Sequence, residues 1–196
     1  MKITVSVNLG GYFFNIDEDA YAELKMYLRN LELHFAREES SSEILSDIET
    51  RMAELFRSKI TSYKQVINIE DVKQAITVMG TPEDISDADG QGSREKFSSR
   101  GYHRMYRDTD NRIIGGVCSG MGAYWNIDPL VLRIIFIALI LAGGIGVMVY
   151  LILYIVLPEA KTTAQKIEMK GEPVNIHNIK EAVKKEFDSV RKTMKF

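Results

Sequence analysis

The sequence contains a single cysteine, Cys118, and only three histidines and four prolines in 196 residues. One cysteine excludes an internal disulfide framework and any metal site built from several cysteines. His34, His103 and His177 are far apart, and none has a second ligand at a metal-binding spacing. We therefore expect no metal site.

Motifs for catalysis and for phosphate binding are also missing. The glycines between Gly115 and Gly122 fit neither G-x-G-x-x-G nor G-x-x-x-x-G-K-[ST]. Ser119 is not in a G-x-S-x-G elbow. The acidic stretches ISDADG and DTDNR fail the pattern of a calcium loop. We expect neither an enzyme nor a cofactor.

The net charge is small, −2, because 25 Lys and Arg nearly balance 27 Asp and Glu, but the charge is unevenly distributed. Residues 1–88 contain nine Lys and Arg against sixteen Asp and Glu, whereas residues 89–196 contain sixteen against eleven. Such asymmetry indicates that the basic half meets an anionic partner, either nucleic acid or a lipid surface. The acidic N-terminal half argues against DNA binding, since basic side chains facing phosphates dominate that affinity.

A long apolar run favours a lipid surface over nucleic acid as the anionic partner. Ile134 to Leu157 are 24 consecutive residues without a formal charge. A helix over this run would be about 36 Å long, and the hydrocarbon core of a bilayer is about 30 Å thick. Because the run is apolar on every side, it favours one transmembrane helix over residues 131–157 rather than a buried helix of a soluble core.

The start of this span has clear signals. Asp128 is a plausible N-cap, Pro129 fits the first helical position, and Arg133 one turn later can extend to the interface. Basic residues on both sides leave open a re-entrant hairpin, with both ends cytoplasmic and the glycines at its apex. We do not interpret the N-terminus as a cleaved signal, and we expect the N-terminal domain in the cytoplasm.

Small residues interrupt the apolar run. Ala138, Ala142 and Gly146 have the small-xxx-small spacing of a close helix–helix contact. Gly143 and Gly144 equally allow a kink or hinge, and glycine is in any case frequent in membrane helices. A second small-residue stretch, expected at the membrane interface or packed under the span, contains Gly115, Gly116, Gly120 and Trp125.

Residues 1–88 are predicted to form a small acidic α+β domain. Alternation in KITVSVNL, followed by Gly10-Gly11, indicates a β-hairpin. Three amphipathic helices follow, the second with a capping box of Ser40 and Glu43 and the third capped by Asn68. A small domain of this kind is more often an interaction unit than an enzyme.

Residues 89–101 and 161–174 are interpreted as linkers, the first because it is rich in Gly, Ser and charge. Residues 175–196 are predicted to form a basic amphipathic helix. Such a helix can bind a partner or a second copy, lie on an anionic membrane, or dock on its own N-terminal domain. Its apolar stripe consists of Ile176, Ile179, Val183, Phe187, Val190 and Met194.

Several motifs follow one another between Tyr106 and Glu159: Arg-Asp…Asn-Arg, Gly-Gly-Val-Cys-Ser-Gly, Ile-Asp-Pro before Val-Leu-Arg, the glycine-interrupted apolar run, and Leu-Pro-Glu. In this combination the segment resembles the PspC domain of the bacterial phage-shock response, and we assign residues 102–160 to a PspC-like membrane domain. The N-terminal domain and the C-terminal helix are additions to the minimal family pattern.

The resemblance implies a mainly α membrane protein that regulates the response to envelope stress at the bacterial inner membrane, without catalysis. It implies binding to a PspA-like peripheral membrane protein or to other membrane regulators, besides the lipid bilayer, and a homo-oligomer is possible. The alternatives are a passive membrane-anchoring or membrane-protecting protein and, less favoured by the charge, a DNA-binding regulator.

Overall fold

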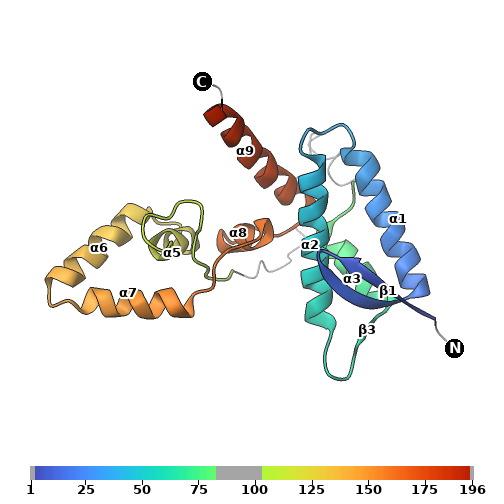
Figure 1. Ribbon diagram of the computed structural model, residues 1–196, viewed down its shortest axis with the longest axis horizontal. Helices are drawn as coiled ribbons and strands as arrows, with labels where there is room; N and C mark the ends of the chain where they lie inside the picture. Colours follow the sequence, from blue (N-terminus) through green and yellow to red (C-terminus); the bar gives the residue numbers. More distant parts are fainter. Residues whose placement is uncertain (1–2, 83–102, 195–196) are drawn as a thin grey trace, which may run out of the picture. The chain divides into compact units, whose positions relative to one another are not determined.

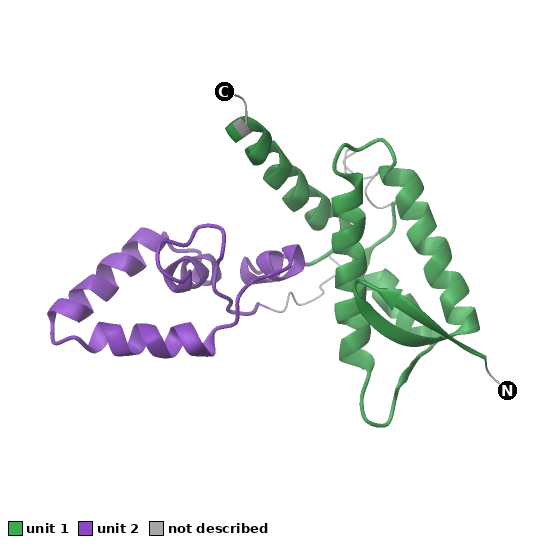
Figure 2. Ribbon diagram, in the orientation of Figure 1, with its two compact units in different colours: residues 1–99, 174–196 green, residues 100–173 purple. Residues whose placement is uncertain are grey.

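The computed structural model describes residues 3–82 and 103–194. The chain divides into two compact units (Figure 2). Unit 1 comprises Met1–Ser99 together with Val174–Phe196, and unit 2 comprises Arg100–Pro173. The C-terminal helix therefore belongs to the same unit as the N-terminal residues, although unit 2 separates the two in sequence.

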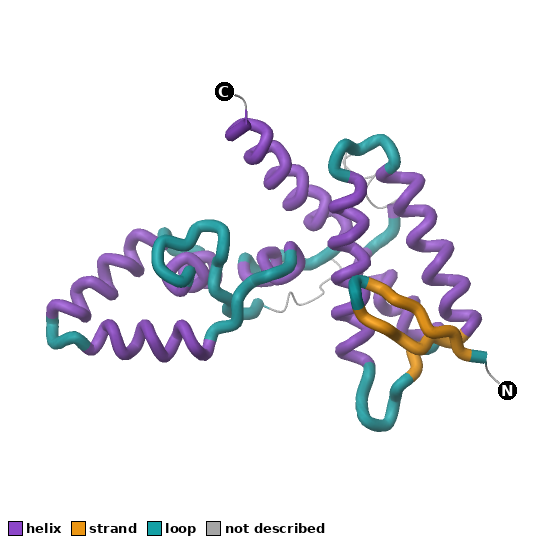
Figure 3. Tube along the Cα trace, in the orientation of Figure 1, coloured by secondary structure: helices purple, strands orange, loops and turns teal. Residues whose placement is uncertain are grey.

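Unit 1 contains a small three-stranded sheet (Figure 3). Strands β1 (Thr4–Leu9) and β2 (Tyr12–Asp17) form the antiparallel hairpin that the alternation predicts. Gly10 and Gly11 both have positive φ, +54° and +82°, as the tight turn between Leu9 and Tyr12 requires. The two-residue strand β3 (Val66–Ile67) pairs with β2 in parallel and completes the order β1-β2-β3.

Three helices pack with this sheet: α1 (Glu18–Phe35), α2 (Ser41–Lys59) and α3 (Ile69–Met79) (Figure 1). The predicted cap of α3 is confirmed, because the Asn68 side chain accepts from the Asp71 amide and Asp71 accepts from the Asn68 amide. Ser40 lies at the N-cap of α2 but makes no side-chain capping bond, so that predicted capping box is not formed. The core of this domain consists of fully buried side chains, among them Ile16, Leu31, Phe35, Ile48, Met52 and Phe56.

Helix α9 (Ile176–Met194) docks on this domain through its first half. Ile176, Ile179 and Val183 are each at most 1 % exposed, and the ammonium of Lys180 lies 3.0 Å from the carboxylate of Glu38. Of the three destinations that the sequence leaves open for this helix, the structure shows docking on the chain's own N-terminal domain for the first half of the apolar stripe. Phe187 and Val190 remain exposed, and the side chain of Met194 lies outside the described residues.

The hydrogen bond from Lys180 lowers the pKa of Glu38 below its usual value. A carboxyl whose pKa is depressed by folding stabilises the folded state above its unfolded pKa, and this contribution is lost as pH falls through the folded pKa. The ion pair is partly exposed and therefore contributes little by itself. Burial of the three aliphatic side chains holds α9 in place.

Unit 2 contains α5 (Val117–Trp125), α6 (Pro129–Leu141), α7 (Ile145–Val156) and α8 (Thr163–Met169). The predicted single helix over 131–157 is not formed, because the apolar run folds into α6 and α7 with a turn between them. The predicted linker 161–174 is also corrected. It contains α8, which starts with a capping box of Thr162 and Gln165 and buries Ile167 and Met169.

Candidate functional site: an apolar hairpin and its base

The turn between α6 and α7 depends on two glycines. Helix α6 ends at Leu141, and Gly143 and Gly144 follow with φ of +138° and +78°. A Cβ added at either glycine would meet nothing within 4 Å. These glycines are therefore required by the backbone conformation and not by a close contact. Of the roles left open by the sequence, the structure shows a bend.

The third glycine of the run does make a close contact. Gly146 is buried, and a Cβ there would lie 2.9 Å from the carbonyl oxygen of Phe136 and from the amide nitrogen of Ile140. The backbone of α7 thus lies directly against α6. Ala138 in α6 and Ala142 at its C-cap are exposed, and the break separates them from Gly146 in α7. The predicted small-residue face along one helix is not formed.

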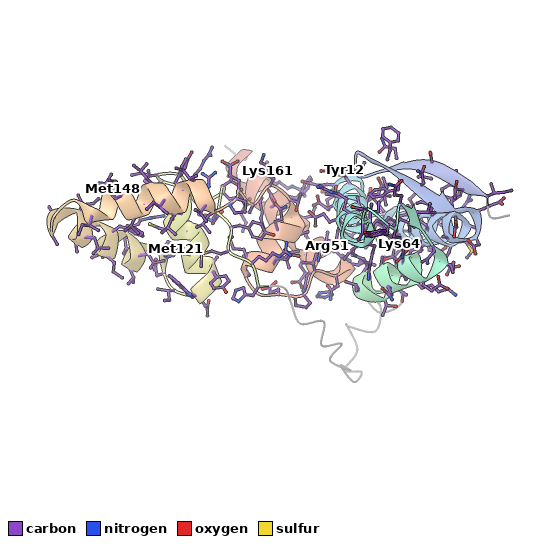
Figure 4. The ribbon with its side chains drawn as sticks, turned by 90° about the horizontal axis from the view of Figure 1, so that it is seen from below. Tyr12, Arg51, Lys64, Met121, Met148 and Lys161 are labelled. Carbon is purple, nitrogen blue, oxygen red and sulfur yellow. The ribbon has the colours of Figure 1, made fainter. Side chains whose placement is uncertain are left out.

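We call residues 129–156 the hairpin, and almost all its large side chains face outward. In α6 only Leu132 and Phe136 are buried, and in α7 only Gly146 is. Met148, for example, is 68 % exposed (Figure 4). The exposed large apolar residues of the hairpin are Leu130, Val131, Ile134, Ile135, Ile137, Leu139, Ile140, Leu141, Ile145, Val147, Met148, Val149, Leu151, Ile152, Tyr154, Ile155 and Val156.

In the part of the chain that the structure describes, no helix combines the length and the apolar character needed to cross a membrane.

The start of the hairpin follows the sequence signals. The Asp128 carboxylate accepts from the Leu130 amide at 2.8 Å, and Pro129 is the first residue of α6. Arg133 makes its contacts within the chain. Its guanidinium lies 3.4 Å from both the carbonyl oxygen of Asn111 and the hydroxyl oxygen of Ser119, so it ties α6 to the chain before it.

We call residues 103–128 together with 157–160 the base of the hairpin, and two glycines make it compact. A Cβ at Gly116 would lie 2.0 Å from the carbonyl oxygen of Asp108, and a Cβ at Gly120 would lie 1.9 Å from that of Tyr106. The N-terminal end of α5 therefore lies against the backbone of residues 106–108. The GxxxG spacing of Gly116 and Gly120 thus allows the helix to contact extended chain within the base. Trp125 at the end of α5 is 48 % exposed.

Arg107 joins the two segments of the base. Its backbone amide donates to the Pro158 carbonyl, and its own carbonyl accepts from the Ala160 amide. Its guanidinium donates to the Leu157 carbonyl at 2.9 Å and to the Glu159 carboxylate at 3.1 Å. The guanidinium also lies 4.2 Å from the centre of the Tyr154 ring. We call these contacts the Arg107 clamp. The sequence contains the Arg-Asp and Leu-Pro-Glu motifs, but nothing in it indicates that the two motifs are in contact.

Further side chains of the base are held in defined places. Asp108 accepts from the backbone amides of Asp110 and Asn111 and closes the loop after the clamp. Tyr106 donates to the Glu168 carboxylate on α8 at 3.1 Å. Burial, followed by the charge of Glu168, raises the pKa of Tyr106. His103 stacks on Tyr124 with 4.1 Å between ring centres.

The thiol of Cys118 is part of the base core and not a reactive group. It is buried with Val117 and Met121 of α5 and with Phe136 of α6. Burial raises the pKa of the thiol, which keeps it protonated near neutral pH. The arrangement as a whole offers an exposed apolar hairpin held by a rigid, hydrogen-bonded base.

The comparisons with known proteins agree with this division. Residues 103–160 match the family model of the PspC domain. No curated protein and no solved structure gave a match. The matched segment begins just before Arg107 and ends at Ala160, so it contains both sides of the Arg107 clamp and the whole hairpin. The chain therefore carries a PspC domain, which links it to phage-shock-type, envelope-stress-related proteins, a group generally associated with membranes.

Proposed function

We propose that the PspC domain of this chain inserts its hairpin into the bacterial inner membrane, and that the protein acts there as a regulator of a phage-shock-type envelope stress response. The observation that carries the proposal is the exposed apolar surface of α6 and α7. Removal of one Leu, Ile or Val side chain from water stabilises a protein by roughly 1.5–3 kcal/mol. The hydrocarbon core of a bilayer can bury all of them at once.

The backbone of the turn also suits a low-dielectric environment. Unpaired amides are costly in hydrocarbon. The Ala142 amide donates to the Ala138 carbonyl, and the Gly144 amide donates to the Ile140 carbonyl at 2.8 Å. The Val147 amide donates back to the Gly144 carbonyl at 3.2 Å. The turn can thus enter the hydrocarbon without leaving these donors unpaired.

The lengths of the two helices favour a re-entrant arrangement. Helix α6 has 13 residues and α7 has 12. At ~1.5 Å per residue each is about 18–20 Å long, against a hydrocarbon core of about 30 Å. The turn would pass the middle of the bilayer without reaching the far side. The base and both flanking segments would then stay on one side, which we propose is the cytoplasmic side.

Reporter fusions at residue 1 and at residue 196 test this topology. We expect both reporters to be active in the cytoplasm and both to be protected from protease added outside. Reporters on opposite sides of the membrane would contradict the re-entrant arrangement and favour a single span.

We propose that regulation operates through binding and not through catalysis. The N-terminal domain and the exposed end of α9, with Phe187 and Val190, supply surfaces for a PspA-like peripheral protein, another membrane regulator or a second copy. This role rests on the PspC domain and on the two-unit organisation.

Deletion of the chain separates regulation from passive anchoring. We expect the deletion to change the expression of stress genes after an envelope insult, while the resting permeability of the membrane to protons stays as in the parent strain. Unchanged expression together with a leaky membrane would contradict the regulatory role and support a structural, membrane-protecting protein. A chain lacking residues 129–156 is the matched variant, and it should behave as the full deletion does.

A further inference from the structure

A shallow cavity of about 480 Å³ opens where the base meets the last turns of α7. Two stretches line it. From the base come Arg112, Ile113 and Ile114, and from α7 come Tyr150, Leu151 and Tyr154. A cation, three aliphatic side chains and two tyrosines thus surround one opening, a combination typical of the level where lipid headgroups meet acyl chains.

The cation of this cavity is available. Arg112 forms no hydrogen bond or ion pair with any residue that the structure describes. The neighbouring charges are engaged elsewhere, since Glu159 pairs with Arg107 and Asp110 pairs with Lys166 at 2.7 Å. The guanidinium of Arg112 therefore forms an ion pair with no carboxylate among the described residues, and it can bind an anion from solvent or from a lipid.

The aliphatic residues beside it are unusually exposed and yet fixed. Ile113 and Ile114 are 72 % and 73 % exposed. The hydroxyl of Tyr150 donates to the carbonyl of Ile114, which ties the loop to α7. Gly115 allows the close approach, because a Cβ there would lie 2.7 Å from the ring of Tyr154. The loop is therefore held at the end of the hairpin by specific contacts.

We propose that this cavity binds an anionic phospholipid, with Arg112 on the headgroup phosphate and with Ile113, Ile114 and Leu151 along the upper acyl chains. The inference rests on the proposed insertion of the hairpin, and it adds a ligand class to it. A planar guanidinium can hold two phosphate oxygens at once. The base would then be anchored at a defined height, at the point where α7 leaves the hydrocarbon.

Lipid retention by the purified full chain in detergent tests the site. The chain is equilibrated with phosphatidylglycerol and phosphatidylcholine, and the bound lipids are counted by native mass spectrometry. We expect the wild type to retain phosphatidylglycerol preferentially. Arg112→Gln should lower that preference by about tenfold, as expected for the loss of a hydrogen bond to a charged group. Arg112→Lys should restore part of it.

Lys161→Gln is the matched control, because it removes one exposed positive charge from the same end of the hairpin but outside the cavity. It should retain the wild-type preference. Inorganic phosphate should not displace the lipid, since it cannot replace the acyl contacts; displacement would show a simple anion site and overturn the proposal. Ile114→Ser should weaken retention of both lipids.

The two proposals fail in different ways. If Arg112→Gln keeps the wild-type lipid preference, the lipid site is overturned. If the chain still stays in the membrane pellet after an alkaline carbonate wash, the insertion of the hairpin stands. If the wild type itself is extracted by carbonate, the insertion falls, and the lipid site falls with it.

Discussion

Arginines on both sides of the hairpin turn, introduced as Leu141→Arg with Ile145→Arg, should release the protein from membranes. The two side chains are 83 % and 63 % exposed and flank the glycines that would lie deepest in the bilayer. Insertion would carry both charges into hydrocarbon, at a cost of about 2.5–3.5 kcal/mol each on translocon scales. The fraction of chain that resists alkaline carbonate should fall from nearly all to a small remainder.

Phe13→Arg is the control for this experiment. Phe13 lies on β2 of the N-terminal domain and is 79 % exposed. The substitution therefore introduces the same charge at a similarly exposed apolar position outside residues 129–156. This variant should stay in the membrane fraction. Because both substituted hairpin residues are exposed, the packing of the base should survive. A double variant that remains in the carbonate-washed pellet would refute insertion of the turn.

The second large effect is expected from Gly120→Ala, which should unfold the base. In an ordinary helix interior, alanine stabilises by about 0.5–1 kcal/mol relative to glycine. Here the new Cβ would lie 1.9 Å from the carbonyl oxygen of Tyr106, a backbone atom that the Arg107 clamp holds in place. We expect a loss of about 3 kcal/mol or more, at the upper end for overpacking.

Limited proteolysis in detergent measures this loss. Cleavage within residues 103–160 should become rapid, whereas unit 1 of the same molecule should keep its wild-type resistance. Gly143→Ala is the control: its Cβ meets nothing, so its cost of about 1–2 kcal/mol is that of positive φ alone and stays at the turn. Equal resistance of Gly120→Ala and the wild type would show that the close approach is not needed.

These two experiments bear on different parts of the PspC domain. The arginines test whether the apolar surface meets lipid, and the alanine tests whether the base is built by backbone contacts. The Arg107 clamp explains why the domain has its limits near residues 103 and 160. It joins residues about 50 positions apart through hydrogen bonds from one side chain, with the hairpin between them.

Features that depend on near neighbours are determined by the sequence itself. The Gly10-Gly11 turn, the Asn68 cap and the start of α6 at Asp128 and Pro129 each involve residues within three or four positions. Local hydrogen bonds and backbone preferences are sufficient to set such features. The motif order between Tyr106 and Glu159 likewise identifies the PspC domain without any knowledge of its fold.

The tertiary structure decides what depends on distant residues. Whether the apolar run is one helix or two cannot be derived from its composition, because glycine is tolerated in an apolar helix and also adopts positive φ. The contact of Gly146 with the backbone of α6 favours the folded-back form. The sequence likewise does not decide where α9 packs. Its amphipathic stripe shows that Ile179 needs an apolar partner, and only the folded N-terminal domain shows which one.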